Sequence, residues 1–223
     1  MTGLRATPPL AAKVRHGADG PEVLVVGSAA SLLEGDRLVV TLLLGAGARL
    51  TVSTVAAQLA HPCPGGGHTA MSVRAELGPD ARLRWRPEPT VVCGGGRHHA
   101  TGAVTLAAGA EAWWLDEVVL GRSGEDPASA SLVAELTVDG PDGPLLRDGL
   151  DTTVTHAHGP AVLGVGVRYV GAQHCWGRRS DASGGEGAVR FDLAGPGTTW
   201  RVLAADVAAG RAALAGVAVS PSR

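Results

Sequence analysis

The sequence is poor in aromatic residues, since only 3% of its 223 residues are Phe, Trp or Tyr. It contains one lysine, Lys13, and its formal net charge is −2. Proteins that bind nucleic acid normally carry a clear basic excess, so we expect no nucleic-acid partner. Hydrophobic residues still make up 45% of the chain. We therefore expect a folded protein whose core is built mostly from Val, Leu and Ala.

Long apolar runs are also missing. No segment reaches 18 consecutive apolar residues, and residues 1–5 lack the apolar stretch of a signal peptide. From these absences we expect no membrane span and a cytoplasmic location. The three cysteines, Cys63, Cys93 and Cys175, are an odd number without a CxxC pair. This pattern fits a reducing compartment better than a secreted domain held by disulfides.

Familiar catalytic motifs are absent from the glycine-rich segments. No serine lies in a G-x-S-x-G elbow, which excludes the usual signature of an α/β-hydrolase. The glycine triplets at residues 65–67 and 94–96 lack the Lys-Ser/Thr of a phosphate-binding loop. Neither a hydrolase elbow nor a nucleotide site is therefore predicted.

What the chain does contain is a repeated pattern, in which an apolar run stops at a small-residue turn and a second apolar run follows. The copies lie at residues 44–50, 77–83 and 106–112, with a degenerate fourth copy at 193–200. Aligned on Ala48, Ala81 and Ala110, the first three are 33 and 29 residues apart. Repeats that cannot bury their own apolar faces stack on one another. We expect a mainly β fold of stacked antiparallel sheets from repeated strand–turn–strand units, with a short C-terminal helical segment.

The chain is short enough to form a single domain over residues 1–223. We divide it into an N-terminal segment (1–20), a repeated β core (21–170), a flexible loop (171–187), and the last strands with the C-terminal helix (188–223). Residues 38–44 are apolar apart from Thr41, which predicts a strand buried on both faces. Residues 139–143 predict a hairpin, and Asp206 is placed to cap the helix.

Two acids stand inside an otherwise apolar predicted strand. Asp116 and Glu117 follow Trp-Trp-Leu and precede Val-Val-Leu. Neighbouring residues on a strand point to opposite faces, so at least one carboxylate is partly buried if both faces are covered. A buried carboxylate is costly unless it is paired, hydrogen-bonded or next to internal water. The pattern therefore makes a polar cavity or channel plausible.

Histidines and cysteines cluster at several points and offer an alternative function. His61, Cys63 and His68 are candidate metal ligands, and the other clusters are Cys93 with His98 and His99, His156 with His158, and His174 with Cys175. None has the repeated spacing of a structural zinc site, so ordinary loop or strand-edge residues are the simpler interpretation. If three such ligands converged, the chain would instead be a metal-dependent β-fold enzyme or a small-molecule-binding protein.

The order of several motifs resembles the urease accessory protein UreD (UreH) family. The matching segments are residues 35–38 (Gly-Asp-Arg-Leu), 45–57, 81–89, 114–122 (from Trp-Leu-Asp-Glu to Leu-Gly-Arg) and 145–150 (Leu-Leu-Arg-Asp-Gly-Leu). No single segment is specific, but the five occur in the family's order with its gaps. The resemblance runs from about residue 20 to residue 155, and more weakly to residue 206.

The resemblance implies a maturation factor that is not an enzyme. Such a protein would bind apo-urease, join a UreF-like accessory protein and a UreG-like GTPase, and help to insert nickel. No tightly bound cofactor is implied, only transient Ni²⁺. By motif position, Asp36, Asp116 and Asp148 fall where the family places acids of a nickel path, with Glu88, Glu117 and Arg122 as secondary candidates. Oxygen ligands suit such a path because they hold Ni²⁺ less tightly than imidazole or thiolate.

Overall fold

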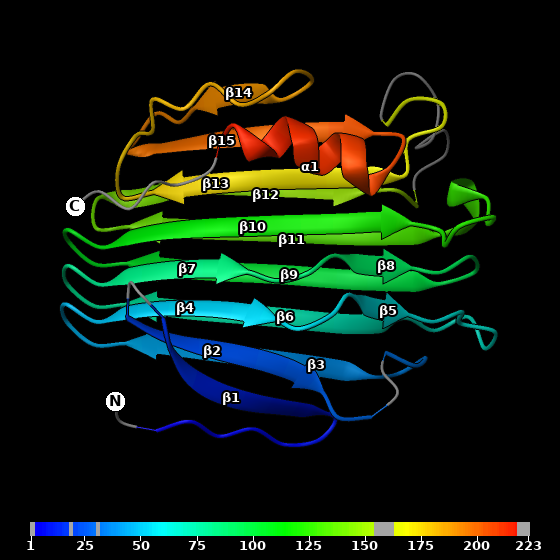
Figure 1. Ribbon diagram of the computed structural model, residues 1–223, viewed down its shortest axis with the longest axis horizontal. Coiled ribbons are helices and arrows are strands. Elements are labelled where there is room, and N and C mark those ends of the chain that lie inside the picture. The colour runs from blue at the N-terminus through cyan, green and yellow to red at the C-terminus, as the bar shows by residue number, and fades with distance from the viewer. Residues whose placement is uncertain (1–2, 18–19, 30–31, 154–162, 218–223) are drawn as a thin grey trace.

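The computed structural model describes residues 3–17, 20–29, 32–153 and 163–217, which form two β-sheets packed face to face (Figure 1). The ten-stranded sheet has the order β1 (Leu10–Gly17), β2 (Gly20–Gly27), β4 (Arg49–Thr54), β7 (Arg82–Arg86), β10 (Glu111–Leu120), β13 (Tyr169–Trp176), β15 (Gly197–Ala204) and β14 (Val189–Asp192), with β5 (Gln58–Ala60) and β8 (Thr90–Val92) beside this path. The five-stranded sheet has the order β12 (Gly143–Asp151), β11 (Ser131–Gly140), β9 (Arg97–Leu106), β6 (Thr69–Leu77) and β3 (Arg37–Leu44). A 3₁₀ turn (Pro127–Ser129) and helix α1 (Val207–Ala215) complete the described elements.

The chain alternates between the two sheets from β3 to β11. It passes from β3 to β4, returns to β6, crosses to β7, and repeats this course through β9, β10 and β11. Each coil adds one strand to each sheet, as in a solenoid. The mainly β fold, the stacked repeats and the short C-terminal helix are therefore confirmed. Among the described residues, no helix is long and apolar enough to cross a membrane.

Strand direction within the coils differs from the antiparallel arrangement that we expected. The ladders β3–β6–β9–β11 and β2–β4–β7–β10 are parallel. Antiparallel pairing is found at the two ends, in β1–β2, β11–β12, β10–β13, β13–β15 and β14–β15. The first three repeated turns carry the chain to the opposite sheet, so each returning strand runs in the same direction as the previous one. Only the fourth copy joins two neighbours in one sheet, β14 and β15.

The repeated turns share one backbone requirement. Gly47, Asp80 and Gly109 occupy equivalent positions and have φ values of 67°, 57° and 70°. Glycine adopts this left-handed conformation without a steric penalty, and aspartate tolerates it better than most residues. Successive turns also stack, because the amide of Gly47 donates to the Pro79 carbonyl and that of Asp80 to the Ala108 carbonyl.

The glycine triplets form the turns at the other end of the coils. Amides of Gly65 and Gly67 donate to the Glu34 carboxylate. The amide of Gly94 donates to Oε2 of Glu125 over 2.7 Å. Both loops thus use backbone amides to hold a glutamate of the same chain. A Cβ atom at Gly67 would lie 2.7 Å from Glu34 Oε1, and one at Gly94 would lie 2.9 Å from Ser129 Oγ, which accounts for these glycines without a phosphate ligand.

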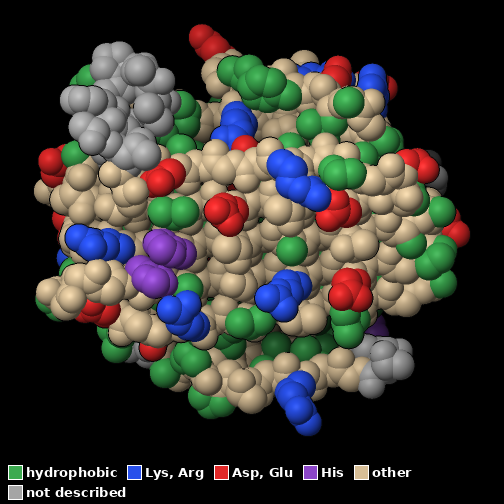
Figure 2. Space-filling model, turned by 180° about the vertical axis from the view of Figure 1, so that it is seen from behind, with side chains coloured by type: hydrophobic (Ala, Val, Ile, Leu, Met, Phe, Trp, Pro, Cys, Tyr) green, Lys and Arg blue, Asp and Glu red, His purple; other side chains and the backbone are tan. Residues whose placement is uncertain are grey.

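The outer face of the five-stranded sheet is open to solvent. Figure 2 shows charged side chains of both signs dispersed over the rear of the molecule. The prediction that residues 38–44 are buried on both faces is wrong. Val39 and Leu43 of β3 are 61% and 69% exposed, whereas Leu38 and Leu44 are buried. β3 is the last strand of this sheet, and alternate side chains point away from the partner sheet.

Three buried clusters hold the fold together. The first lies between the sheets near the repeated turns and includes Trp85, Trp114 and Trp176. The second fills the opposite end of the same space around Leu32 and Leu120. The third lies on the outer face of the ten-stranded sheet, where α1 covers β13 and β15 (Figure 1).

The C-terminal part of the chain agrees with the sequence in two respects and differs in one. The hairpin at residues 139–143 joins β11 to β12. Asp206 caps α1, because its Oδ1 accepts the amide of Ala209 at 2.8 Å. The expected loop over residues 171–187 is wrong in its first part, since β13 continues to Trp176. His156 and His158 lie outside the described residues.

Candidate functional site

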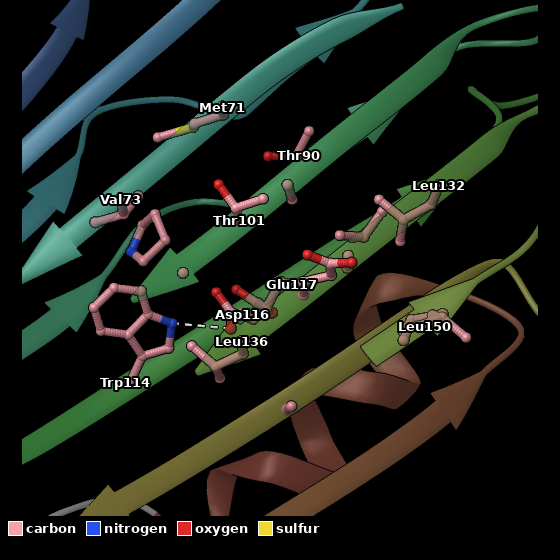
Figure 3. Close-up of a pocket in the computed structure, with 18 of the residues that line it drawn as sticks. Met71, Val73, Thr90, Thr101, Trp114, Asp116, Glu117, Leu132, Leu136 and Leu150 are labelled. Atoms are coloured by element: carbon pink, nitrogen blue, oxygen red, sulfur yellow. Dashed lines mark hydrogen bonds between the residues drawn. The ribbon is translucent and has the colours of Figure 1, made fainter. Parts of the chain in front are cut away.

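A cavity of about 150 Å³ lies between the two sheets. It separates the first buried cluster, which contains Trp85 and Trp114, from the second, which surrounds Leu32 and Leu120. Much of its wall is apolar, with Met71, Val73, Leu132, Leu136 and Leu150 among the lining residues. Figure 3 shows the strands that contribute these side chains and the acids of β10 beside them. The residues with ionisable or cationic side chains among those that line the same space are Glu88, His98, Asp116, Glu117, Glu135, Asp148, His174 and Arg201.

Asp116 lies on the inner face of β10, in the middle of the strand. It follows Trp114 on that face, and the Trp114 Nε1 donates to Asp116 Oδ2 over 2.9 Å (Figure 3). Asp116 keeps some exposed surface, but it lines the cavity and is shielded from bulk water. Burial raises the pKa of Asp116 to about 6, although the Trp114 hydrogen bond and the nearby Arg201 charge act in the opposite direction. A carboxylate with such a pKa takes up and releases a proton near neutral pH.

Arg201 connects this carboxylate to the opposite sheet. Ladder register places Asp116 of β10 beside Ala172 of β13, and Ala172 beside Arg201 of β15. The small Ala172 side chain leaves space between the two charged groups. Arg201 Nη2 contacts Oδ2 of Asp148 on β12, so that an ion pair spans the two sheets. The Asp148 side chain is 23% exposed, and solvent therefore reaches the cavity at this end.

Two buried histidines also line the cavity, and both are neutral at pH 7. Burial lowers the pKa of His98 to about 4, with additional contributions from His99 and His68. Burial lowers the pKa of His174 to about 3. In each ring Nδ1 lies near a threonine hydroxyl, 2.8 Å from Thr69 for His98 and 3.0 Å from Thr199 for His174. The hydroxyls fix the ring positions.

Glu117 is adjacent to Asp116 in sequence but faces the outside of the sheet, beneath α1. Its side chain is 1% exposed. Tyr169 donates its hydroxyl to Oε1 at 2.8 Å, and Arg211 of α1 donates from Nε at 2.8 Å and from Nη2 at 2.9 Å. Arg211 Nη2 also donates to Glu88 at 2.8 Å. The buried carboxylate of Glu117 is thus fully compensated.

Two of the predicted path residues lie away from the cavity. Asp36 is in the turn before β3, where its Oδ2 accepts the amide of Leu33 at 2.8 Å. Arg122 forms an ion pair with Glu125 at 2.6 Å in the loop after β10. Hydrogen bonds from Arg122 and the amide of Gly94 lower the pKa of Glu125 to about 2. Both residues stabilise turns in this arrangement.

The candidate metal ligands His61, Cys63 and His68 do not form a metal site. The buried thiol of Cys63 donates to the carbonyls of His61 and Arg97, and the His68 ring stacks on that of His99 at 4.0 Å. Across the described residues, no three His, Cys, Asp or Glu side chains are grouped so that they could hold a metal ion. The arrangement therefore gives no support to the alternative of a His/Cys metalloenzyme in this part of the chain.

The sequence did not identify Arg201 or Arg211 as members of the site. Arg201 meets Asp148 across 53 residues, and Arg211 meets Glu117 across 94 residues. One weak signal was available, since arginine is the natural partner for a carboxylate in a strand with both faces covered. That signal does not choose among the many arginines of the chain. Chemically, the cavity offers carboxylates from both sheets and neutral imidazoles at one apolar space.

Comparison with known proteins gives a consistent result. A family model described as UreD urease accessory protein matches residues 1–220. The urease accessory protein UreD of Parafrankia sp. (strain EAN1pec) is 35% identical over 236 residues, covering 94% of this chain and 79% of the relative. That of Frankia alni is 38% identical over 207 residues, covering 82% and 68%. UreD 1 of Saccharopolyspora erythraea is 35% identical over 219 residues, covering 95% and 85%.

Proposed function

Because the chain belongs to the UreD urease accessory protein family, we propose that it binds apo-urease and supports the insertion of nickel into the urease active site. In this role the protein carries out no catalysis of its own. Nickel is its cargo, bound transiently, and no resident cofactor is required. The protein works in the cytoplasm, where it joins a UreF-like accessory protein and, through that complex, a UreG-like GTPase.

The observation that supports this proposal is the placement of Asp116 and Asp148 on opposite sheets around one cavity. Carboxylate oxygens are weaker ligands for Ni²⁺ than a set of thiolates and imidazoles. They can therefore accept the ion and release it again. Asp148 lies where solvent reaches the cavity, and Asp116 lies deeper. A cation entering at Asp148 meets a second carboxylate further along the space.

The Arg201–Asp148 ion pair balances one of the two carboxylates of this route. Two buried carboxylates without a cation would repel each other and take up protons. Arg201 supplies the missing positive charge while the cavity holds no metal. We infer that Ni²⁺ exchanges with the guanidinium at Asp148, so that the two carboxylates balance the charge of the ion during transfer.

Co-expression with urease tests the proposed role. Urease subunits are produced with a complete set of accessory proteins, with and without this chain, and the nickel content and activity of purified urease are measured. The proposal predicts that omission of the chain leaves urease mostly without nickel, and that the tagged chain co-purifies with apo-urease. Full nickel content without the chain would overturn the role in maturation. Normal maturation without co-purification would overturn direct binding.

A further inference from the structure

The ten-stranded sheet is interrupted beside the two acids of β10. β7 and β8 are separated by Pro87-Glu88-Pro89, and the parallel ladder along this side of β10 stops at Trp114 and resumes at Val118. Proline has no amide hydrogen to donate, which explains why pairing fails at this point. The neighbouring coil has a similar break between β4 and β5, and Figure 1 shows the two breaks next to each other. The break thus crosses two neighbouring coils.

The cavity extends to this break. The cavity lining includes Asp116 and five residues at the rim of the break, which are Thr54, Gln58, Pro87, Glu88 and Thr90. The Glu88 side chain is 43% exposed, although it lines the same space. Two residues that line the cavity thus have partly exposed side chains, Asp148 near the edge of the five-stranded sheet and Glu88 in the break, and these mark the places where the cavity comes nearest to solvent.

Arg211 lies over the break at Glu88. Its guanidinium donates to Glu117 through Nε and Nη2 and to Glu88 through Nη2, which joins β10 to the segment between β7 and β8. The side chain is 44% exposed and so occupies the boundary between the sheet and solvent. Its position depends on α1, which packs so closely on the sheet that a Cβ atom at Gly210 would overlap the Tyr169 ring.

We propose that Arg211 is a removable plug, which closes the second opening of the cavity and must leave Glu88 and Glu117 before a cation can pass there. This inference rests on the proposed function, because it takes a divalent cation as the species that passes. Removal of the guanidinium would leave two neighbouring carboxylates without compensation, and an incoming cation restores their balance. The cavity then has an arginine–carboxylate pair at each opening, Arg201 with Asp148 and Arg211 with Glu88.

Thiol accessibility in the purified protein tests the plug without any nickel. Val118→Cys places a reporter thiol on β10 just beyond the break, where Val118 lines the cavity. Leu150→Cys places one on β12 at the Asp148 end, where Leu150 also lines the cavity (Figure 3). The rate of reaction with a small cationic methanethiosulfonate is measured for each reporter. The unsubstituted chain, with its three buried cysteines, gives the background rate.

Addition of Arg211→Ala is expected to raise the rate at Val118→Cys by about tenfold or more, because charge-assisted hydrogen bonds no longer oppose opening. The rate at Leu150→Cys should not change. Arg147→Ala is the matched control, since Arg147 forms an ion pair of similar exposure with Asp139 on the other sheet. Glu88→Gln removes only the exposed half of the bridge and should give a smaller rise without affecting folding.

An unchanged rate at Val118→Cys in both Arg211→Ala and Glu88→Gln would overturn the plug. An equal rise at both reporters would also overturn it, because that result indicates general loosening of the fold. Failure of the proposed function is a separate result. If nickel loading of urease does not depend on this chain, the nickel role is lost, whereas the two thiol rates still decide whether Arg211 closes the cavity.

Discussion

The two faces of β10 carry adjacent carboxylates in very different surroundings. Outside the sheet, Glu117 receives hydrogen bonds from Tyr169 and Arg211 and is buried beneath α1. Inside the sheet, Asp116 receives one hydrogen bond, from Trp114, and faces a cavity. The charge of Glu117 is balanced by its hydrogen-bond partners, whereas Asp116 can still bind a cation in the cavity. The difference indicates that Glu117 stabilises the structure, whereas Asp116 lowers stability and is available for function.

We expect the largest loss of stability from a substitution on the outer face of β10. Glu117→Ala leaves the Tyr169 hydroxyl and one side of Arg211 without their acceptor. Breaking a buried ion pair typically costs about 3–5 kcal/mol, and we expect about 2–4 kcal/mol here because Arg211 is partly exposed and can regain water. Urea denaturation of the purified protein measures this loss.

The matched control is Asp139→Ala, which removes the exposed ion pair with Arg147. Surface pairs of this kind contribute about 0–1 kcal/mol. If Glu117→Ala cost no more than Asp139→Ala, the outer carboxylate would not be the stabilising member of the pair on β10.

On the inner face, we expect removal of the carboxylate to raise the stability of the protein. The folded protein holds the Asp116 proton up to a pKa of about 6, whereas the unfolded chain releases it near 3.8. Between these values the folded state binds more protons, so its stability falls as the pH rises. Asp116→Asn removes this penalty and should stabilise the protein by about 3 kcal/mol at pH 7.5, with little effect near pH 4. Urea midpoints at the two pH values provide the measurement.

The side-chain carbonyl oxygen introduced by Asp116→Asn can still accept the Trp114 hydrogen bond, so the comparison isolates the charge. A gain of the same size at both pH values would show that the carboxylate charge is not the cause. A loss of stability at pH 7.5 would show that Asp116 is paired in a way that the cavity geometry does not include.

A smaller change in stability should report how tightly α1 packs against the sheet. Glycine to alanine normally stabilises a helix by up to about 1 kcal/mol. At Gly210 the added methyl would overlap the Tyr169 ring, and overpacking of this kind costs about 1–3 kcal/mol. We therefore expect Gly210→Ala to lower the thermal midpoint, in contrast to the usual helix effect. An unchanged or raised midpoint would indicate that α1 can move away from β13 at little cost, so that close packing of α1 would not be what holds Arg211 in place.

The sequence predicted the fold class well because the repeated turns impose a local backbone requirement. Gly47, Asp80 and Gly109 are spaced as the coils are, and each provides the left-handed conformation that the turn needs. Strand direction could not be predicted in the same way. A turn that reverses a strand within one sheet and a turn that crosses to a second sheet use the same small residues, as the fourth copy before β15 demonstrates.

Part of the candidate site was also predictable. Asp116 stood out because a carboxylate in an apolar strand needs a specific environment, and Asp148 was named from the family resemblance. The histidine clusters were misleading, because adjacent residues on a strand diverge: His98 points into the cavity, whereas His99 stacks on His68. Arg201 and Arg211 reach their partners across long stretches of chain, and no local pattern encodes such contacts.

The most direct test of nickel transfer through the cavity is the nickel content of urease that matures with the Asp116→Asn variant of this chain, compared with the Asp139→Asn variant. We predict a severalfold lower nickel content with Asp116→Asn, although this variant should be the more stable protein at neutral pH. Asp139→Asn should leave nickel content at the native level. Native nickel content with Asp116→Asn would contradict the central claim that the carboxylate inside the sheet serves the transfer of nickel.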